Sequence, residues 1–82
     1  MGVTEDLADE LAKDTIKYIE ATGDEQIIAD LVKLMGASSQ TAEEAFLTAI
    51  RVRRANIKAR ALLVQRAKDF KDGKAPPDAF TD

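Results

Sequence analysis

The feature that most limits the fold of this chain is a stretch of 31 residues, 42–72, that contains neither glycine nor proline. These are the two residues that most strongly interrupt a helix, and β-branched residues are also few here. The stretch therefore predicts one long helix that ends at Gly73. A helix of this length is unusual in a small domain. A break or kink near residues 53–56, where the apolar pattern is weakest, is the alternative.

A first helix is predicted over residues 4–21. Thr4 is a suitable N-cap, and Gly23 is expected to end the helix in the left-handed conformation. Apolar and small residues recur at helical spacing and predict one buried face. Its members are Ala8, Leu11, Ala12, Thr15, Ile16 and Ile19.

A second helix is predicted over residues 25–35, capped by Asp24 and ended by Gly36 in the same way as the first. Its expected buried stripe consists of Ile27, Ile28, Leu31, Leu34 and Met35. Thr41 and Glu44 then form a capping-box pattern, in which each side chain bonds the backbone N–H of the other residue. This pattern predicts the start of the third helix.

The 82 residues are enough for one domain. The pattern predicts a small all-α bundle of three helices in a single domain, 1–73. Pro76 and Pro77 predict that residues 74–82 form an extended or disordered tail. The third helix would span about 46 Å, nearly the summed length of the first two. We therefore expect the second helix to lie antiparallel to the first half of the third, and the first helix to cover the second half.

The composition excludes several classes of function. The chain has no cysteine and no histidine, which removes disulfides, thiolate metal sites and the commonest general base. No apolar run approaches the length of a membrane span. The acids Asp6, Asp9, Glu10 and Asp14 on one side of the first helix are interpreted as a solvated acidic face, or as the complement to the basic third helix, rather than as a metal site. The sequence thus predicts a soluble, cytoplasmic, non-enzymatic protein without cofactor or metal.

Charge is distributed unevenly. Residues 1–44 carry 11 acids and 3 bases, whereas residues 45–82 carry 4 acids and 9 bases. The stretch RVRRANIKARALLVQR, residues 51–66, holds six cations and no acid. Such a stretch can bind phosphates, or it can be one side of a core whose other side is acidic.

A helical wheel of the third helix favours the core interpretation. One apolar band consists of Ala45, Ala49, Val52, Ala59, Leu63, Ala67 and Phe70, and the other of Phe46, Ile50, Ile57, Ala61 and Val64. Together they span roughly 200°, wider than the ordinary stripe of a surface helix. A helix this apolar needs partners on two sides, so self-association is expected.

Arg53 and Arg60 lie between the two bands, with Lys71 on the same line. An arginine flanked by apolar side chains needs an acceptor for its guanidinium. An ion pair within or between subunits is therefore expected, and the candidate acceptors are Asp14, Glu20 and Asp30. The residues predicted to carry a protein–protein contact are Arg53, Arg60, Phe46, Ile50, Ile57 and Val64.

Nucleic-acid binding is the alternative function. The residues that would contact phosphate are Arg51, Arg54, Lys58, Arg66 and Lys68. Two observations weigh against it. The cationic stretch has no aromatic side chain for stacking on bases, and the whole chain is acidic, with a pI of about 4.9.

Residues 31–46, LVKLMGASSQTAEEAF, resemble parts of three families. The glycine turn resembles that of bacterial helix-turn-helix domains, the Met-Gly turn and spaced alanines resemble ubiquitin-associated domains, and the spacing up to Phe46 resembles RNA-binding antiterminator domains. Each resemblance covers only about 16–25 residues. Because three unrelated families fit one stretch, it indicates a general helix–glycine–cap–helix pattern and predicts no family.

Overall fold

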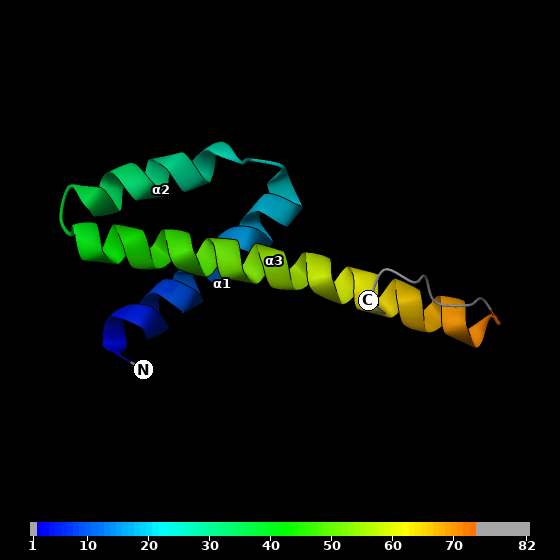
Figure 1. Ribbon diagram of the computed structural model, residues 1–82. Helices are drawn as coiled ribbons and strands as arrows, with labels where there is room; N and C mark the ends of the chain where they lie inside the picture. The colour runs from blue at the N-terminus through cyan, green and yellow to red at the C-terminus, as the bar shows by residue number, and fades with distance from the viewer. Residues whose placement is uncertain (1, 74–82) are drawn as a thin grey trace.

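The computed structural model describes residues 2–73 and contains three helices (Figure 1). They are α1 (Val3–Thr22), α2 (Gln26–Gly36) and α3 (Gln40–Lys71), and no strand occurs among the described residues. The predicted all-α fold of three helices is confirmed. None of the helices in this part of the chain is both long and apolar enough to cross a membrane. The predicted tail, 74–82, lies outside the described residues.

Helix α3 is a single element of 32 residues that continues through positions 53–56 (Figure 1). The alternative of a kink there is not confirmed. Its N-cap is Ser39, whose hydroxyl accepts a hydrogen bond of 3.1 Å from the backbone N–H of Ala42. The predicted capping box of Thr41 and Glu44 is wrong because the helix has already begun when the chain reaches Thr41. Gly73, with a φ of 85°, follows the helix as expected.

The ends of α1 agree only in part with the prediction. Gly2 is the N-cap, and it offers no side chain to the helix, so Thr4 lies inside the first turn. Gly23 ends the helix in the left-handed conformation, with a φ of 76°. Its N–H donates a hydrogen bond of 2.7 Å to the carbonyl of Ile19. The predicted role of Gly23 is therefore confirmed.

Helix α2 begins and ends without the predicted caps. Its N-cap is Glu25, in a helical conformation, and no side chain caps it. The Asp24 carboxylate instead accepts a hydrogen bond of 2.9 Å from the Tyr18 hydroxyl. Gly36 is the last helical residue, and Ala37 continues with a φ of −66°. No left-handed glycine is needed here because the chain leaves α2 through right-handed turns.

The core lies between α1 and the first half of α3. The predicted face of α1 is confirmed: five of its six members are buried, and Leu11 packs against them. Phe46, which is 0% exposed, and Ile50 fill this face from α3. Thr15 is the one buried polar residue among residues 2–73, and its hydroxyl donates a hydrogen bond of 2.7 Å to the Leu11 carbonyl. The hydroxyl is therefore not an unsatisfied donor.

Helix α2 covers the core from one side with a stripe slightly different from the predicted one. The side chains that pack against the core are Ile28, Leu31, Val32 and Met35. They follow the spacing of one helical face. Leu34 lies outside this face and is 69% exposed, so its predicted burial is wrong.

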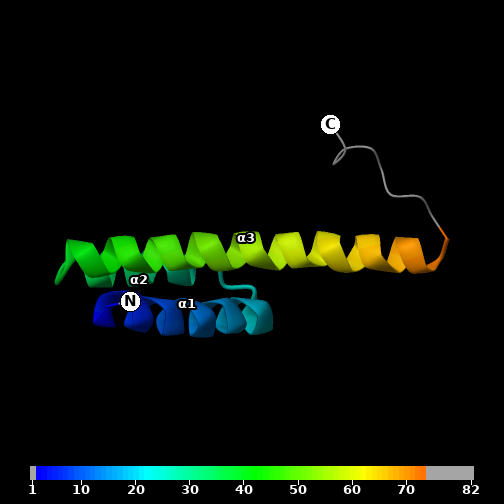
Figure 2. The ribbon, with the colours of Figure 1, turned by 60° about the horizontal axis from the view of Figure 1, so that its bottom comes forward.

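The arrangement leaves half of α3 uncovered (Figure 2). Helix α1 runs in the same direction as α3: Val3 lies near Ala42, and Ile16 lies near Ile57. The prediction that the first helix covers the second half of the third is therefore wrong. The radius of gyration is 17.1 Å, whereas a compact chain of this length has about 11–12 Å.

Candidate interaction surface

The distal half of α3, residues 57–71, extends beyond α1 and α2 except at its start, where Ile57 and Lys58 still border α1 (Figure 2). None of its side chains is buried, and only two are partly covered. Its large apolar side chains are Ile57, Leu62, Leu63, Val64 and Phe70. Leu63 is 65% exposed and Phe70 is 72% exposed. Apolar side chains gathered on one exposed segment typically mark a surface that contacts a partner.

Some of these side chains belong to a line that runs along most of α3, which we call the seam. Its positions alternate in steps of four and three residues: Ala45, Ala49, Val52, Asn56, Ala59, Leu63, Arg66 and Phe70. This spacing is that of the a and d positions of a coiled coil. The seam is small at its proximal end, where alanines dominate, and large at its distal end, where Leu63 and Phe70 stand. The two ends therefore differ in shape.

The structure separates the apolar residues that the sequence grouped as a contact site. Phe46 and Ile50 are enclosed between α1 and α3 and belong to the chain's own core. Ile57 is about half exposed, where α1 and α3 diverge, and Val64 is exposed in the distal half. Only Ile57 and Val64 are therefore accessible to a partner of the folded chain.

Arg53 joins α3 to α1 through a bidentate ion pair with Asp9. The distances are 2.6 Å from Nε to Oδ1 and 2.8 Å from a terminal nitrogen to Oδ2. The hydrogen bond from Arg53 lowers the pKa of the Asp9 carboxyl, and the same bond raises the pKa of Arg53. An ion pair was expected for Arg53, but Asp9 was not among the three candidate acceptors. Arg60 is exposed and makes no ion pair with any residue in the range 2–73.

The cations of the alternative nucleic-acid site are in different environments. Arg54 donates hydrogen bonds of 3.0 Å to both carboxylate oxygens of Glu25, just before α2. Arg66 is partly covered. The remaining three, which are exposed, are Arg51, Lys58 and Lys68. The five cations therefore do not form one uniform free strip.

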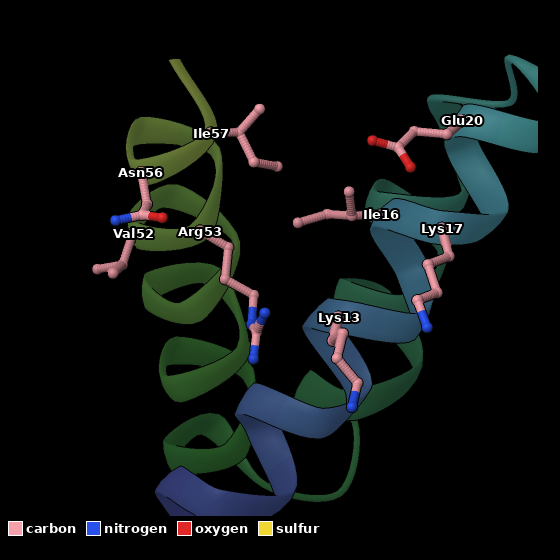
Figure 3. Close-up of a pocket in the computed structure, with 8 residues that line it drawn as sticks. All are labelled: Lys13, Ile16, Lys17, Glu20, Val52, Arg53, Asn56 and Ile57. Atoms are coloured by element: carbon pink, nitrogen blue, oxygen red, sulfur yellow. The ribbon is translucent and has the colours of Figure 1, made fainter. Parts of the chain in front are cut away.

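A groove of about 400 Å³ lies where α1 and α3 move apart (Figure 3). Ile16 and Ile57 point toward one another across it, and the Arg53 side chain extends from α3 toward α1. Lys13, Lys17 and Glu20 line the α1 side. The apolar centre of this groove is an extension of the core, and the side chains around it carry both positive and negative charges. This arrangement favours no particular ligand.

A second groove, of about 520 Å³, lies between the N-terminal parts of α1 and α3. Its walls are Glu5 and Asp9 of α1 and Glu44 of α3. The α3 side chains along it are small or medium-sized: Thr41, Ala45, Thr48, Ala49 and Val52. The groove thus combines the proximal end of the seam with three carboxylates.

Sequence reasoning did not pair Asp9 with Arg53 or Glu25 with Arg54, and it left Leu62 and Leu63 out of the predicted contact residues. Asp9 was one of the acids that could complement the third helix, and Leu63 was a member of an apolar band. The steps of four and three that connect Ala45 to Phe70 were the signal that could have identified Leu63. No comparable signal exists for Asp9 and Glu25, because their pairing with Arg53 and Arg54 depends on the direction of α1 and on the path of the turn before α2. Within residues 2–73, no three acidic side chains converge as a metal site.

Comparison of the chain with protein-family models, with curated proteins and with solved structures finds no match.

Proposed function

We propose that this chain is a non-catalytic protein that acts through protein–protein contact, and that it self-associates through the distal half of α3. The cytoplasmic location expected from the sequence stays a prediction. The observation that carries the proposal is the apolar surface of a segment that its own chain leaves uncovered, with Leu63 and Phe70 more than three-fifths exposed.

Burial of apolar side chains supplies the free energy for self-association. Burial of one exposed leucine or phenylalanine side chain stabilises a complex by about 1.5–3 kcal/mol before the costs of association. Several such side chains on one helix supply enough to hold two chains together. A helix of about 15 residues standing alone in water is also only marginally stable. Coverage by a second chain would stabilise the distal half as a helix.

Replacement of Leu63 by glutamate tests the proposal. Light scattering after size-exclusion chromatography is expected to show wild-type oligomers whose fraction grows with concentration. In L63E the dissociation constant of a dimer should rise by about 100-fold, because each of the two copies loses at least about 1.4 kcal/mol.

The matched control is Ala61→Glu, which adds the same charge to the same exposed half of α3 but on the side opposite the seam. It is expected to associate like the wild type, and circular dichroism should show equal helix content in both variants. A wild-type chain that is strictly monomeric at high concentration contradicts the proposal.

Nucleic-acid binding is the second candidate, supported by the exposed cations Arg51, Lys58 and Lys68. Contacts of cations with phosphate weaken steeply with salt. A binding titration with mixed single- and double-stranded nucleic acids at low salt tests this second function. If the chain shows no affinity at low salt, nucleic-acid binding is excluded.

A further inference from the structure

The two ends of the seam complement one another in shape. The proximal end borders the groove of about 520 Å³ between α1 and α3, which Ala45, Ala49 and Val52 line. Ala45 and Ala49 also pack in part against the chain's own core. The distal end presents Leu63 and Phe70, which no part of residues 2–73 covers. Small residues at one end of a line and large ones at the other fit together when two copies of the line run in opposite directions.

We infer that a second copy of this chain docks antiparallel, with the distal half of its α3 in the groove beside the proximal half of the first. In this register the partner's Phe70 lies over Ala45, and the partner's Leu63 lies over Val52. A twofold axis makes the contact reciprocal, so each copy both supplies a distal half and accepts one. This inference rests on the proposed self-association. It adds which surface of each copy is in contact and that the two α3 helices run antiparallel.

Charge favours the same direction. Helix α1 carries six acids and two bases, whereas residues 57–71 carry five bases and one acid. A parallel pair would place the two cationic distal halves against each other, which is unfavourable. An antiparallel pair places each distal half beside the acidic α1 of the other copy.

The positions of individual cations are consistent with this pairing. Arg53, Arg60 and Lys71 lie on one line of α3, and Arg53 shows that this line faces α1, because it binds Asp9. In an antiparallel pair related by a twofold axis, corresponding flanks of the two helices meet. In the inferred register Lys71 therefore lies level with the partner's Glu44 and beside the partner's Glu5, which lines the receiving groove. Arg60 lies level with the partner's Ala55, eleven positions further along α3.

Asn56 stands near the centre of the seam. In the inferred register it pairs with the partner's Ala59, which brings the two Asn56 residues to about 4.5 Å of one another along the helix axis, three residues at 1.5 Å each. A polar residue inside an apolar seam typically fixes the register of paired helices. The seam holds two polar residues, Asn56 near its centre and Arg66 in its distal half. Asn56 would fix the register in the same way.

Cysteine crosslinking tests the direction, since the natural chain has no cysteine. Val52→Cys and Leu63→Cys are made as separate full-length proteins, and both positions are exposed in the single chain. Each protein is treated with a mild oxidant alone, and an equal mixture of the two is treated after subunit exchange. The inferred register predicts covalent dimers in about half of the mixed sample, the share of mixed pairs at random exchange, and few in either protein alone.

The reason is distance. In the antiparallel register the two copies of position 52 are about 16 Å apart along the axis, as are the two copies of position 63, because 11 positions separate Val52 from Leu63. A disulfide needs Cα atoms within about 7 Å. Efficient crosslinking of each variant with itself would overturn the antiparallel direction but leave self-association intact. A wild-type chain that scatters light as a monomer would overturn both.

Discussion

The bidentate pair of Arg53 and Asp9 fixes how α1 crosses α3. The two side chains remain one-third and about one-half exposed, and pairs at such positions contribute little to stability on their own. Their geometry is nevertheless specific, since both carboxylate oxygens are engaged. The pair therefore selects the direction of α1 more than it adds to the free energy of folding.

Replacement of Asp9 by asparagine should lower the melting temperature at pH 7 and reduce its dependence on pH. The pKa of Asp9 is lowered in the folded chain by the hydrogen bond from Arg53. The stabilising contribution is therefore present above the pKa of the unfolded carboxyl, about 4, and is lost as the pH falls through the lower folded value. Melting curves by circular dichroism between about pH 7 and pH 2 should show the difference from wild type closing in acid.

The control is Asp6→Asn, which changes the net charge equally on the same helix without touching Arg53. It should show a smaller difference from wild type at pH 7. A difference between D9N and wild type that stays constant down to about pH 2 argues against the pair.

At the scale of the helices, the spacing of apolar residues predicted the number of helices and the buried face of α1. The buried face of α1 could be read directly because its members recur on one side and no competing apolar face exists. In α2, Leu34 and Val32 are equally apolar, and only the angle at which α2 meets the core decides that Val32 is the one that packs. The cap of α3 was misplaced for a similar reason, since Ser39 and Thr41 are both good caps two residues apart.

Ser39→Ala is expected to lower the free energy of unfolding by about 1 kcal/mol, because the N–H of Ala42 loses its acceptor. Thr41→Ala should change it far less, although Thr41 has the stronger sequence signature of a capping box. Urea unfolding of both variants at one fixed protein concentration measures the difference. An equal loss in the free energy of unfolding in the two variants would contradict the assignment of Ser39 as the N-cap.

At the scale of the whole molecule, the arrangement of the helices could not be predicted from the sequence. The two apolar bands run along the whole of α3, so α1 could pack against either half of the helix. Both arrangements would bury similar residues. The chain uses the proximal half, so that Phe46 and Ile50 become core while Leu63 and Phe70 stay exposed. No local pattern distinguishes these two pairs, because all four side chains are large, apolar and at helical spacing.

The exposed distal half should be the least stable part of the folded monomer. In the L63E variant, hydrogen exchange of the backbone amides over residues 57–71 is expected to be faster than over the proximal half of α3. In wild-type protein at a concentration that supports self-association, exchange over 57–71 should slow by about tenfold or more. Mass spectrometry of peptic peptides measures both. Equal exchange over 57–71 in the two proteins would mean that no partner covers this segment.

The hydrogen bond between Tyr18 and Asp24 has a practical consequence. The chain holds one tyrosine and no tryptophan, so its absorbance near 280 nm comes essentially from a single phenol that bridges the end of α1 and the turn before α2. Acceptance of this bond by the Asp24 carboxylate raises the pKa of Tyr18. A spectrophotometric alkaline titration therefore reports on that turn, because loss of the bond to Asp24 would return the pKa of Tyr18 toward its ordinary value.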